Sequence, residues 1–314
     1  MRILFWGTPE FALPSLRALL GEGHDVVGVV TQPDRPAGRG RALQSPPVKR
    51  IAREERLPVL QPPRPVGDEF LSAVSALAPE LSVVVAYGQI LRREVLDLPA
   101  LGSINVHASL LPALRGAAPI QWAIVHGHKF SGVTIMRMVE KMDAGPMLMQ
   151  VAEPIGPEET GTDLAARLSE IGAEVLIEAL ALREAGVHTE TPQDDHRATF
   201  APRIKREDAH IDWTLDADSV ARRIRAFDAV PGAWTTLEDT ELKVFRPRVH
   251  EDSGPVGEPG TVVETSEFDP ACGMRVACGS GSVWVREVQP PGRRRMTTTA
   301  WLHGRSLSEH ARLA

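Results

Sequence analysis

The chain has 314 residues, of which 43% are hydrophobic, and its 35 Lys and Arg against 41 Asp and Glu give a formal net charge of −6. This length exceeds that of a typical single core, so we expect two domains of a soluble protein. The negative balance excludes a positive field over the whole surface, and a nucleic-acid partner would therefore need a local basic patch.

Cysteine content and hydropathy bear on the compartment. Cys272 and Cys278 stand without further Cys or a His pair at metal spacing, which favours two ordinary thiols over a disulfide framework or zinc. The apolar run at residues 1–7 is too short for a signal peptide, and no later segment approaches the length of a membrane span. We therefore expect a cytoplasmic protein that does not contact a membrane.

The first residues alternate between strand and helix patterns. Strands are expected over 2–7 and 26–31, with a helix between them that begins near Glu10. This opening predicts an α/β fold with a Rossmann-like, mostly parallel sheet and helices on both faces. The turn at residues 7–9 lacks the G-x-G-x-x-G pattern, which argues against a dinucleotide site.

A Gly- and Pro-rich loop follows over residues 32–44. It carries Arg35, Arg39 and Arg41 against a single acid, Asp34. Loops of this length without internal structure are usually functional or disordered. Two interpretations stay open, a solvated mobile loop and a clamp on a phosphate backbone, since Arg pairs well with phosphate oxygens.

Further α/β alternation follows, with elements expected at 46–56 (helix), 58–61 (strand) and 68–77 (helix). The continuous apolar run at 81–87 is typical of a central parallel strand covered on both faces. The next strand is expected at 104–107, and in it Asn105 and His107 share one face because side chains alternate. The exits of both strands are therefore expected at the same edge of the sheet.

The stretch after residue 107 reads as a loop that contains Pro112, and a helix is predicted from about Ala117. A strand end, a loop and a helix start meet there, and ligands of open α/β sheets bind outside such carboxyl ends. Asp143 follows a predicted strand over 132–138 and is expected in a loop.

Asn105, His107 and Asp143 lack a nucleophilic Ser or Cys in an activating motif, because Ser109 is outside a G-x-S-x-G elbow. The trio suits transfer between a bound donor and a bound acceptor through a tetrahedral intermediate. Asn105 and a protonated His107 would face the oxyanion, and Asp143 would orient the imidazole and relay a proton. Taken singly, each side chain also fits a purely structural role, as a hydrogen-bonding His, a turn Asp or a backbone-satisfying Asn.

The longest helix is predicted to be capped by Thr162 and to end at Gly186, with an apolar stripe at Leu164, Leu168, Ile171, Val175, Ala179 and Leu182. Periodicity fades into a polar linker over 186–202, so we place domains at 1–202 and 203–314.

The second domain is predicted to begin with a helix over 217–227, on which Val220 and Ile224 face inward. Short strands separated by Gly and Pro are then expected at 234–237, 242–249, 261–264, 274–277 and 283–288. Five short strands in this length predict a small closed barrel of the OB type.

The sequence Asn-Val-His-Ala-Ser-Leu-Leu-Pro at 105–112, with Asp-Ala-Gly at 143–145, resembles the signature of formyltransferases that use 10-formyltetrahydrofolate. Within that group, residues 115–121 and the arginine loop at 32–40 resemble the methionyl-tRNA formyltransferases. The resemblance extends from Ile3 to about Phe245 and more weakly through the barrel. Residues 113–114, Ala-Leu, depart from the basic and aromatic pair that relatives often carry, which puts one tRNA or folate contact in doubt.

This resemblance implies transfer of the formyl group of 10-formyltetrahydrofolate to the α-amino group of methionyl initiator tRNA, for translation initiation. It implies a catalytic trio of Asn105, His107 and Asp143. The implied folate contacts are Ser109, Leu110, Leu111, Pro112, Tyr87, Gly88, Ile90 and Leu91. The implied tRNA contacts are Arg35, Arg39, Arg41, Arg203, Lys205 and Arg206. The barrel would assist tRNA binding, no metal is implied, and we expect a monomer.

Three alternatives remain. A sugar-nucleotide amine formyltransferase shares the trio and the turn, but its small acceptor would not need the arginine loop. Glycinamide ribonucleotide formyltransferase shares the trio and is usually a single, shorter domain. A non-catalytic RNA-binding protein, from a different class, would use the loop and the barrel but leave the polar trio without a role.

Overall fold

The computed structural model describes residues 1–37, 42–251, 256–266, 269, 272–303, 307 and 311–314. The chain divides into two compact units. The first comprises Met1–Pro119, Phe130–Pro154 and Ala165–Pro202. The second comprises Ile120–Lys129, Ile155–Leu164 and Arg203–Ala314. No helix among these described residues is long and apolar enough to cross a membrane.

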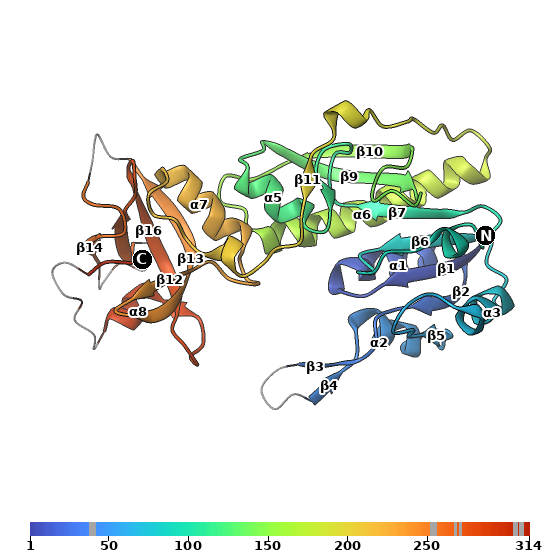
Figure 1. Cartoon of the computed structure of the whole chain (residues 1–314), viewed down its shortest axis with the longest axis horizontal. Coiled ribbons are helices and arrows are strands. Elements are labelled where there is room, and N and C mark those ends of the chain that lie inside the picture. The colour runs from blue at the N-terminus through green and yellow to red at the C-terminus, as the bar shows by residue number, and fades with distance from the viewer. Residues whose placement is uncertain (38–41, 252–255, 267–268, 270–271, 304–306, 308–310) are drawn as a thin grey trace. The chain divides into compact units, whose positions relative to one another are not determined.

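A seven-stranded sheet forms the centre of the first unit, in the order β10-β9-β7-β6-β1-β2-β5 (Figure 1). Its strands are β1 (Arg2–Gly7), β2 (Asp25–Val30), β5 (Val59–Leu60), β6 (Leu81–Val85), β7 (Ser103–His107), β9 (Phe130–Arg137) and β10 (Met147–Pro154). The pairs from β7 through β5 are parallel, whereas β9 runs antiparallel to both β7 and β10. The mostly parallel sheet that the sequence predicts is confirmed, although β10 was not among the predicted strands.

Helices cover both faces of this sheet. They are α1 (Leu13–Gly21), preceded by a 3-10 turn at Glu10–Ala12, then α2 (Pro47–Glu54), α3 (Asp68–Ala76), α4 (Arg93–Leu96) and α6 (Gly161–Glu184). Trp6 and Val84 pack with residues of α3 and α4 in one cluster. On the opposite face, Gly172 of α6 approaches Val106 so closely that an added Cβ would lie 3.0 Å from its Cγ1. The interiors of β1, β2, β6, β7 and β9 are therefore buried on both sides, which explains the continuous apolar runs.

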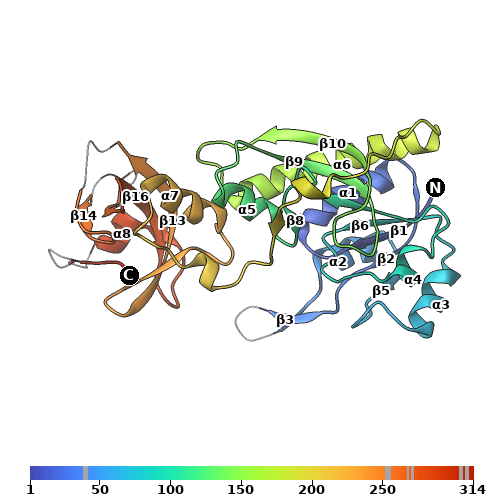
Figure 2. The same ribbon diagram turned by 45° about the horizontal axis from the view of Figure 1, so that its top comes forward.

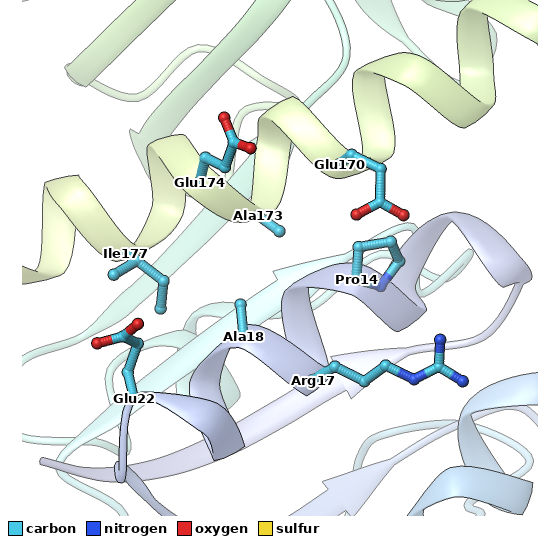
Figure 3. Close-up of a pocket in the computed structure, with 8 residues that line it drawn as sticks. All are labelled: Pro14, Arg17, Ala18, Glu22, Glu170, Ala173, Glu174 and Ile177. Carbon is cyan, nitrogen blue, oxygen red and sulfur yellow. The ribbon is translucent and has the colours of Figure 1, made fainter.

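Helices α1 and α6 lie side by side in the first unit (Figure 3). Small side chains, Ala18 and Ala173, line the space between them, and Glu22 and Glu174 stand at its edge. These side chains line an open surface hollow of about 520 Å³.

Two predictions for α6 need correction. Its N-cap is Thr160 rather than Thr162, because Thr160 Oγ1 accepts from Asp163 N at 3.2 Å while Thr160 N donates to Asp163 Oδ2 at 3.2 Å. This reciprocal pair is a capping box. The predicted stripe is buried at Leu164, Leu168, Val175 and Ala179, but Leu182 is 37% exposed.

The long loop that the sequence predicts over 32–44 contains an antiparallel ribbon, β3 (Arg35–Ala37) paired with β4 (Ala42–Gln44). The expectation of no internal structure is wrong for these residues. The ribbon projects from the first unit (Figures 1 and 2). At its base Lys49 Nζ lies 2.7 Å from Asp34 Oδ1, and Gln61 Nε2 donates to the same oxygen at 2.9 Å. These two contacts lower the pKa of Asp34, Gln61 contributing most, so the carboxylate stays ionised as an anchor.

The predicted linker over 186–202 belongs to the first unit by its hydrogen bonds. Thr191 pairs with Met147, and β11 (Phe200–Ala201) runs parallel to β8 (Arg115–Gly116). The interpretation of this segment as a linker is therefore wrong. Its lack of periodicity reflects pairing with distant backbone rather than a missing structure.

A barrel forms most of the second unit. Its strands are β12 (Trp234–Leu237), β13 (Thr240–His250), β14 (Val262–Thr265), β15 (Met274–Ala277), β16 (Ser282–Gln289) and β17 (Met296–Thr297). They pair antiparallel in the order β12-β13-β16-β15-β14, with β17 beside β16. Leu313 bridges to Leu237 and Arg312 to Thr261, so the final residues connect the two edges of the sheet. The predicted small barrel is confirmed.

Three helices complete this second part of the chain: α5 (Pro119–Val125), α7 (Ala217–Ala226) and α8 (Thr298–Leu302). Val220 and Ile224 of α7 are fully buried, as the sequence predicts. The helix thus contributes to the barrel's core through one apolar face.

Candidate active site

Strand register brings Asn105 and His107 to one face of the sheet. Asn105 pairs with Val84 in β6 and with Met136 in β9, and Val84 in turn pairs with Trp6 in β1. His107 lies two residues further, at the end of β7, and therefore points the same way. The two side chains are 9% and 6% exposed. They reach the carboxyl edge on the face that also holds the Trp6 cluster.

Both ring nitrogens of His107 face identified groups. Nε2 lies 3.1 Å from the carbonyl oxygen of Leu114, and Nδ1 lies 3.8 Å from Oδ2 of Asp143. A carbonyl oxygen can only accept, so this contact favours the tautomer that carries its proton on Nε2. Nδ1 is then the nitrogen that can gain or lose a proton on the side of Asp143.

Asp143 lies in the loop between β9 and β10 and is held by a backbone group. Its Oδ2 accepts from the N–H of Gly116 at 2.8 Å. Asp143 has φ +48°, and Leu114, which contacts the other nitrogen of His107, has φ +59°. Left-handed backbone at residues other than Gly is unfavourable and is typical of functional sites. Two residues that contact His107, Leu114 and Asp143, therefore have energetically unfavourable φ angles.

The side-chain amide of Asn105 has no hydrogen-bond partner among the residues that the structure describes. Its nitrogen and oxygen are not among the fully buried polar atoms that lack a partner, so they reach the accessible space at the end of β7. The Asn105 amide is therefore available to donate to, or accept from, a bound molecule at the end of β7.

The turn after His107 satisfies its polar groups internally. Ser109 Oγ donates to the Ala113 carbonyl at 2.7 Å, and Thr134 Oγ1 donates to the Ser109 carbonyl at 2.7 Å. Gln150 Nε2 donates to the Leu111 carbonyl at 3.0 Å. Ser109 and Leu111 are buried, while Leu110 and Pro112 are half-buried. These contacts give the turn a fixed shape beside the polar trio.

The exit of β6 lies at the same edge of the sheet. Tyr87 and Leu91 are 2% and 4% exposed, and the Tyr87 ring meets Trp6 edge-on at 5.2 Å. Burial raises the pKa of Tyr87 to about 12, so its phenol stays neutral. Gly88 has φ +86°, which turns the chain so that Ile90 is 71% exposed. The segment therefore offers one exposed aliphatic side chain on a rigid apolar base.

Gln32 connects this segment to the arginine ribbon. Its Nε2 donates to the Tyr87 carbonyl at 3.2 Å, and its Oε1 accepts from Arg35 Nη2 at 2.9 Å. Thr8 Oγ1 also donates to the Tyr87 carbonyl, at 2.9 Å. The first arginine of the ribbon and the backbone of the β6 exit are thus joined through one buried side chain.

Sequence reasoning missed a second group of polar residues around Asp143. Arg115 is 1% exposed, pairs with Asp195 at 2.8 Å and donates to Gln193 Oε1. Hydrogen bonds from Lys141 and then Arg115 lower the pKa of Asp195, which keeps it ionised. Gln193 and Asp195 lie in the segment read as a linker, where no periodicity signals a role.

The basic residues named from the sequence fall into separate places. Arg35 is exposed on β3 in the first unit. Arg203, Lys205 and Arg206 are exposed in the second unit, where Arg206 pairs with Glu241 and its guanidinium lies 5.1 Å from the Trp234 ring. Arg39 and Arg41 lie outside the described residues.

Neither cysteine forms a disulfide with a described residue, and Cys278 is buried. Within the described ranges, no group of three or more His, Cys, Asp or Glu side chains is arranged to hold a metal ion.

Known family models match both parts of the chain. Residues 1–180 match the family model described as formyl transferase, and residues 203–306 match the formyl transferase C-terminal domain. Among solved structures, the sugar 3N-formyl transferase WlaRD superimposes with a TM-score of 0.67 at 17% identity, over 94% of this chain and 99% of that one. A methionyl-tRNA formyltransferase from Clostridium thermocellum gives 0.57 at 16% identity, over 80% and 94%. Identities this low support the fold alone.

Curated relatives are similar over the full length. The methionyl-tRNA formyltransferase of Geobacter sulfurreducens is 45% identical, over 100% of this chain and 96% of the relative. That of Methylococcus capsulatus is 47% identical, over 98% of both chains. The chain therefore belongs to the formyl transferase family and, within it, to the methionyl-tRNA formyltransferases.

Proposed function

We propose that this protein transfers the formyl group of 10-formyltetrahydrofolate to the α-amino group of methionyl initiator tRNA, the step that prepares this tRNA for translation initiation. The observation that carries the proposal is the meeting of Asn105, His107 and Asp143 at the end of β7. A free amide, an imidazole and a carboxylate there match what acyl transfer between two bound molecules requires. Family membership supports both substrates.

In the proposed reaction, the neutral amine of the methionyl ester attacks the formyl carbon and forms a new C–N bond. The carbonyl oxygen becomes an oxyanion, to which the Asn105 amide donates. The nitrogen then loses a proton, which Asp143 relays to N10 of the folate as the carbonyl reforms and the bond from carbon to N10 breaks. Protonated His107 donates from both nitrogens, to Leu114 and on the side of Asp143, and its positive charge favours the oxyanion.

We propose that the folate lies against the rigid turn and the β6 exit. In this proposal the contacts are Ser109, Leu110, Leu111, Pro112, Tyr87, Gly88, Ile90 and Leu91. Exposed Ile90 would pack on the pterin, while buried Tyr87 and Leu91 support it from beneath. Because Ser109 and Leu111 are buried and internally bonded, they would act chiefly by shaping the turn.

We propose that Arg35, Arg39 and Arg41 contact the tRNA from the first unit, and that Arg203, Lys205 and Arg206 do so from the second. In this proposal residues 1–202 form the catalytic domain, and residues 203–314 form the barrel domain that assists tRNA binding. Exposed cations on a chain of net charge −6 would supply the local positive patches that a polyanion needs. We also propose a cytoplasmic monomer, which size-exclusion chromatography with light scattering would test.

The decisive assay supplies 10-formyltetrahydrofolate together with one of three acceptors: charged initiator tRNA, charged elongator methionine tRNA or an amino-sugar nucleotide. We expect rapid formylation of the first acceptor only. Preferred formylation of the sugar nucleotide would support the alternative sugar-modifying function, which has a structural relative in WlaRD. Binding of tRNA without formyl transfer would support the non-catalytic alternative.

The role of His107 gives a direct prediction. Replacing His107 by Ala should lower kcat at least about a hundredfold with little loss of tRNA affinity, because the imidazolium would act on the transition state rather than on binding. Steady-state kinetics and tRNA titration measure the two quantities. His128→Ala, an exposed histidine in the second unit, is the matched control and should retain activity. Near-normal turnover of His107→Ala would rule out this role.

A further inference from the structure

The segment over 191–201 passes along the loop that holds Asp143 and is anchored there by backbone pairs. Thr191 and Met147 exchange two hydrogen bonds of 2.8 Å. Thr199 Oγ1 accepts from Leu114 N at 2.8 Å. Both ends of the segment are therefore fixed, which gives the side chains between them defined positions.

Gln193 lies between these anchors and uses all of its hydrogen-bonding capacity. Its Oε1 accepts from Arg115 Nε at 3.0 Å and from Arg115 Nη2 at 2.8 Å. Its Nε2 donates to the carbonyl of Asp143 at 2.9 Å and to that of Gly145 at 2.7 Å. A primary amide offers two protons and two lone pairs, so every position is occupied. These four hydrogen bonds fix both the position and the orientation of the amide.

An ion pair between buried Arg115 and half-exposed Asp195 holds the other side of this amide. Arg115 is 1% exposed and lies 2.8 Å from Asp195 Oδ1, while Lys141 Nζ lies 2.5 Å from Asp195 Oδ2. A buried guanidinium has to keep its partners, because an unpaired charge in the interior is strongly unfavourable. Arg115 therefore cannot move away from Gln193 without a large cost.

We propose that Gln193 is a positioning residue for formyl transfer: its amide holds the backbone at the carbonyls of Asp143 and Gly145, so that the Asp143 carboxylate stays on Gly116 N and beside His107. The inference rests on the proposed catalytic role of Asp143. Such a restraint favours the observed backbone, because Asp143 has φ +48°, a left-handed conformation that is uncommon for residues other than Gly.

The loop is also tight beyond Asp143. A Cβ on Gly145 would lie 1.8 Å from the carbonyl oxygen of Arg137, so the backbone there already touches β9. The two bonds from Gln193 act on the Asp143 and Gly145 carbonyls, on either side of Ala144. Loss of both bonds would let the loop relax away from β9 and carry the carboxylate off His107.

The Gln193→Glu variant removes the two hydrogen bonds that Gln193 donates and keeps the two that it accepts. The carboxylate has the size of the amide and still accepts from Arg115, but it cannot donate to the Asp143 and Gly145 carbonyls and repels them. We expect kcat to fall at least about tenfold while KM for both substrates changes less than about threefold, because Gln193 would not touch either substrate. Gln289→Glu is the matched control, since Gln289 Nε2 also donates to a backbone carbonyl, that of Arg293, but in the barrel.

A double-mutant cycle with Asp143→Asn distinguishes positioning from a general structural role. If Gln193 acts through Asp143, the fall in kcat caused by Gln193→Glu should shrink to less than about twofold in the Asp143→Asn background. An equal fall in both backgrounds, a change in KM alone or an unchanged kcat would overturn the inference. Near-normal activity of Asp143→Asn by itself would instead overturn the proposed role of Asp143.

Asp195→Asn provides the test if Gln193→Glu does not fold. Its side chain is 57% exposed, so the substitution spares the core but weakens the hold on Arg115. We expect a smaller fall in kcat that also vanishes in the Asp143→Asn background. A normal kcat, or a fall that persists in that background, would overturn the inference by this route.

Discussion

Gly116 links the two sides of the candidate site through its backbone. Its N–H donates to Asp143 Oδ2 at 2.8 Å, its φ is +124°, and it pairs with Ala201 between β8 and β11. A Cβ at this position would lie 2.5 Å from the Ala201 carbonyl oxygen. Only Gly fits both the angle and the close approach, so the position of Asp143 depends on a residue without a side chain.

Replacing Gly116 by Ala should therefore reduce catalysis more than binding. The new methyl group must push β8 away from β11 and move the N–H away from Asp143, which we expect to lower kcat at least about tenfold, or roughly 1.4 kcal/mol of transition-state stabilisation. Gly21→Ala is the control, since Gly21 ends α1 and an added Cβ meets nothing within 4 Å. Equal kcat values for the two variants would contradict this account.

At the scale of elements, the sequence predicts those whose signal is local. The buried strands β1, β2 and β6 follow from apolar runs, and α7 follows from the spacing of Val220 and Ile224. Edge strand β10 and the ribbon β3–β4 carry weaker patterns, because β10 has no fully buried residue and residues 35, 36 and 42–44 of the ribbon are exposed. Two-residue β11 exists only through its pairing with β8, a contact that no local window contains.

The same division applies to the site. The face shared by Asn105 and His107 follows from alternation within one strand. The contacts of Gln193 and Asp195 join segments about fifty residues apart. They also depend on the left-handed backbone of Leu114 and Asp143, which the residue types at those positions do not predict.

The ribbon gives a prediction about tRNA binding. Because Arg39 and Arg41 are proposed to bind phosphates from a firmly anchored base, replacing both by Ala should weaken tRNA binding and flatten its salt dependence, by roughly one unit of slope for each arginine replaced. Titrations at several salt concentrations measure the slope. Arg50→Ala with Arg53→Ala removes the same charge from exposed positions on α2 and should change the slope less. An unchanged slope for the ribbon variant would assign its arginines to solvent.

At the scale of the whole molecule, the barrel unit is not one continuous stretch of chain. It includes Ile155–Leu164, whose residues bind the end of α7 and the segment that follows it. Thr162 Oγ1 donates to the Asp228 carbonyl at 2.7 Å, and Arg225 Nη1 donates to the Glu159 carbonyl at 2.8 Å. Stability of the barrel should therefore depend on residues that precede it by about forty positions or more.

A fragment of residues 203–314 tests this dependence on the rest of the unit, because it lacks the segments 120–129 and 155–164. Without the segment 155–164 it cannot form the two hydrogen bonds above or the 3.1 Å ion pair between Arg286 and Glu158. At about 1 kcal/mol per hydrogen bond, and about 4–8 °C per kcal/mol for a domain of this size, we expect the fragment to melt on the order of 10 °C below the barrel transition of the full chain. Calorimetry of both, with full-length Thr162→Val as a smaller version of the same change, measures the difference. A fragment that melts at the full-chain temperature would show that the barrel is complete without these segments, since the removed interactions would then contribute nothing to its stability.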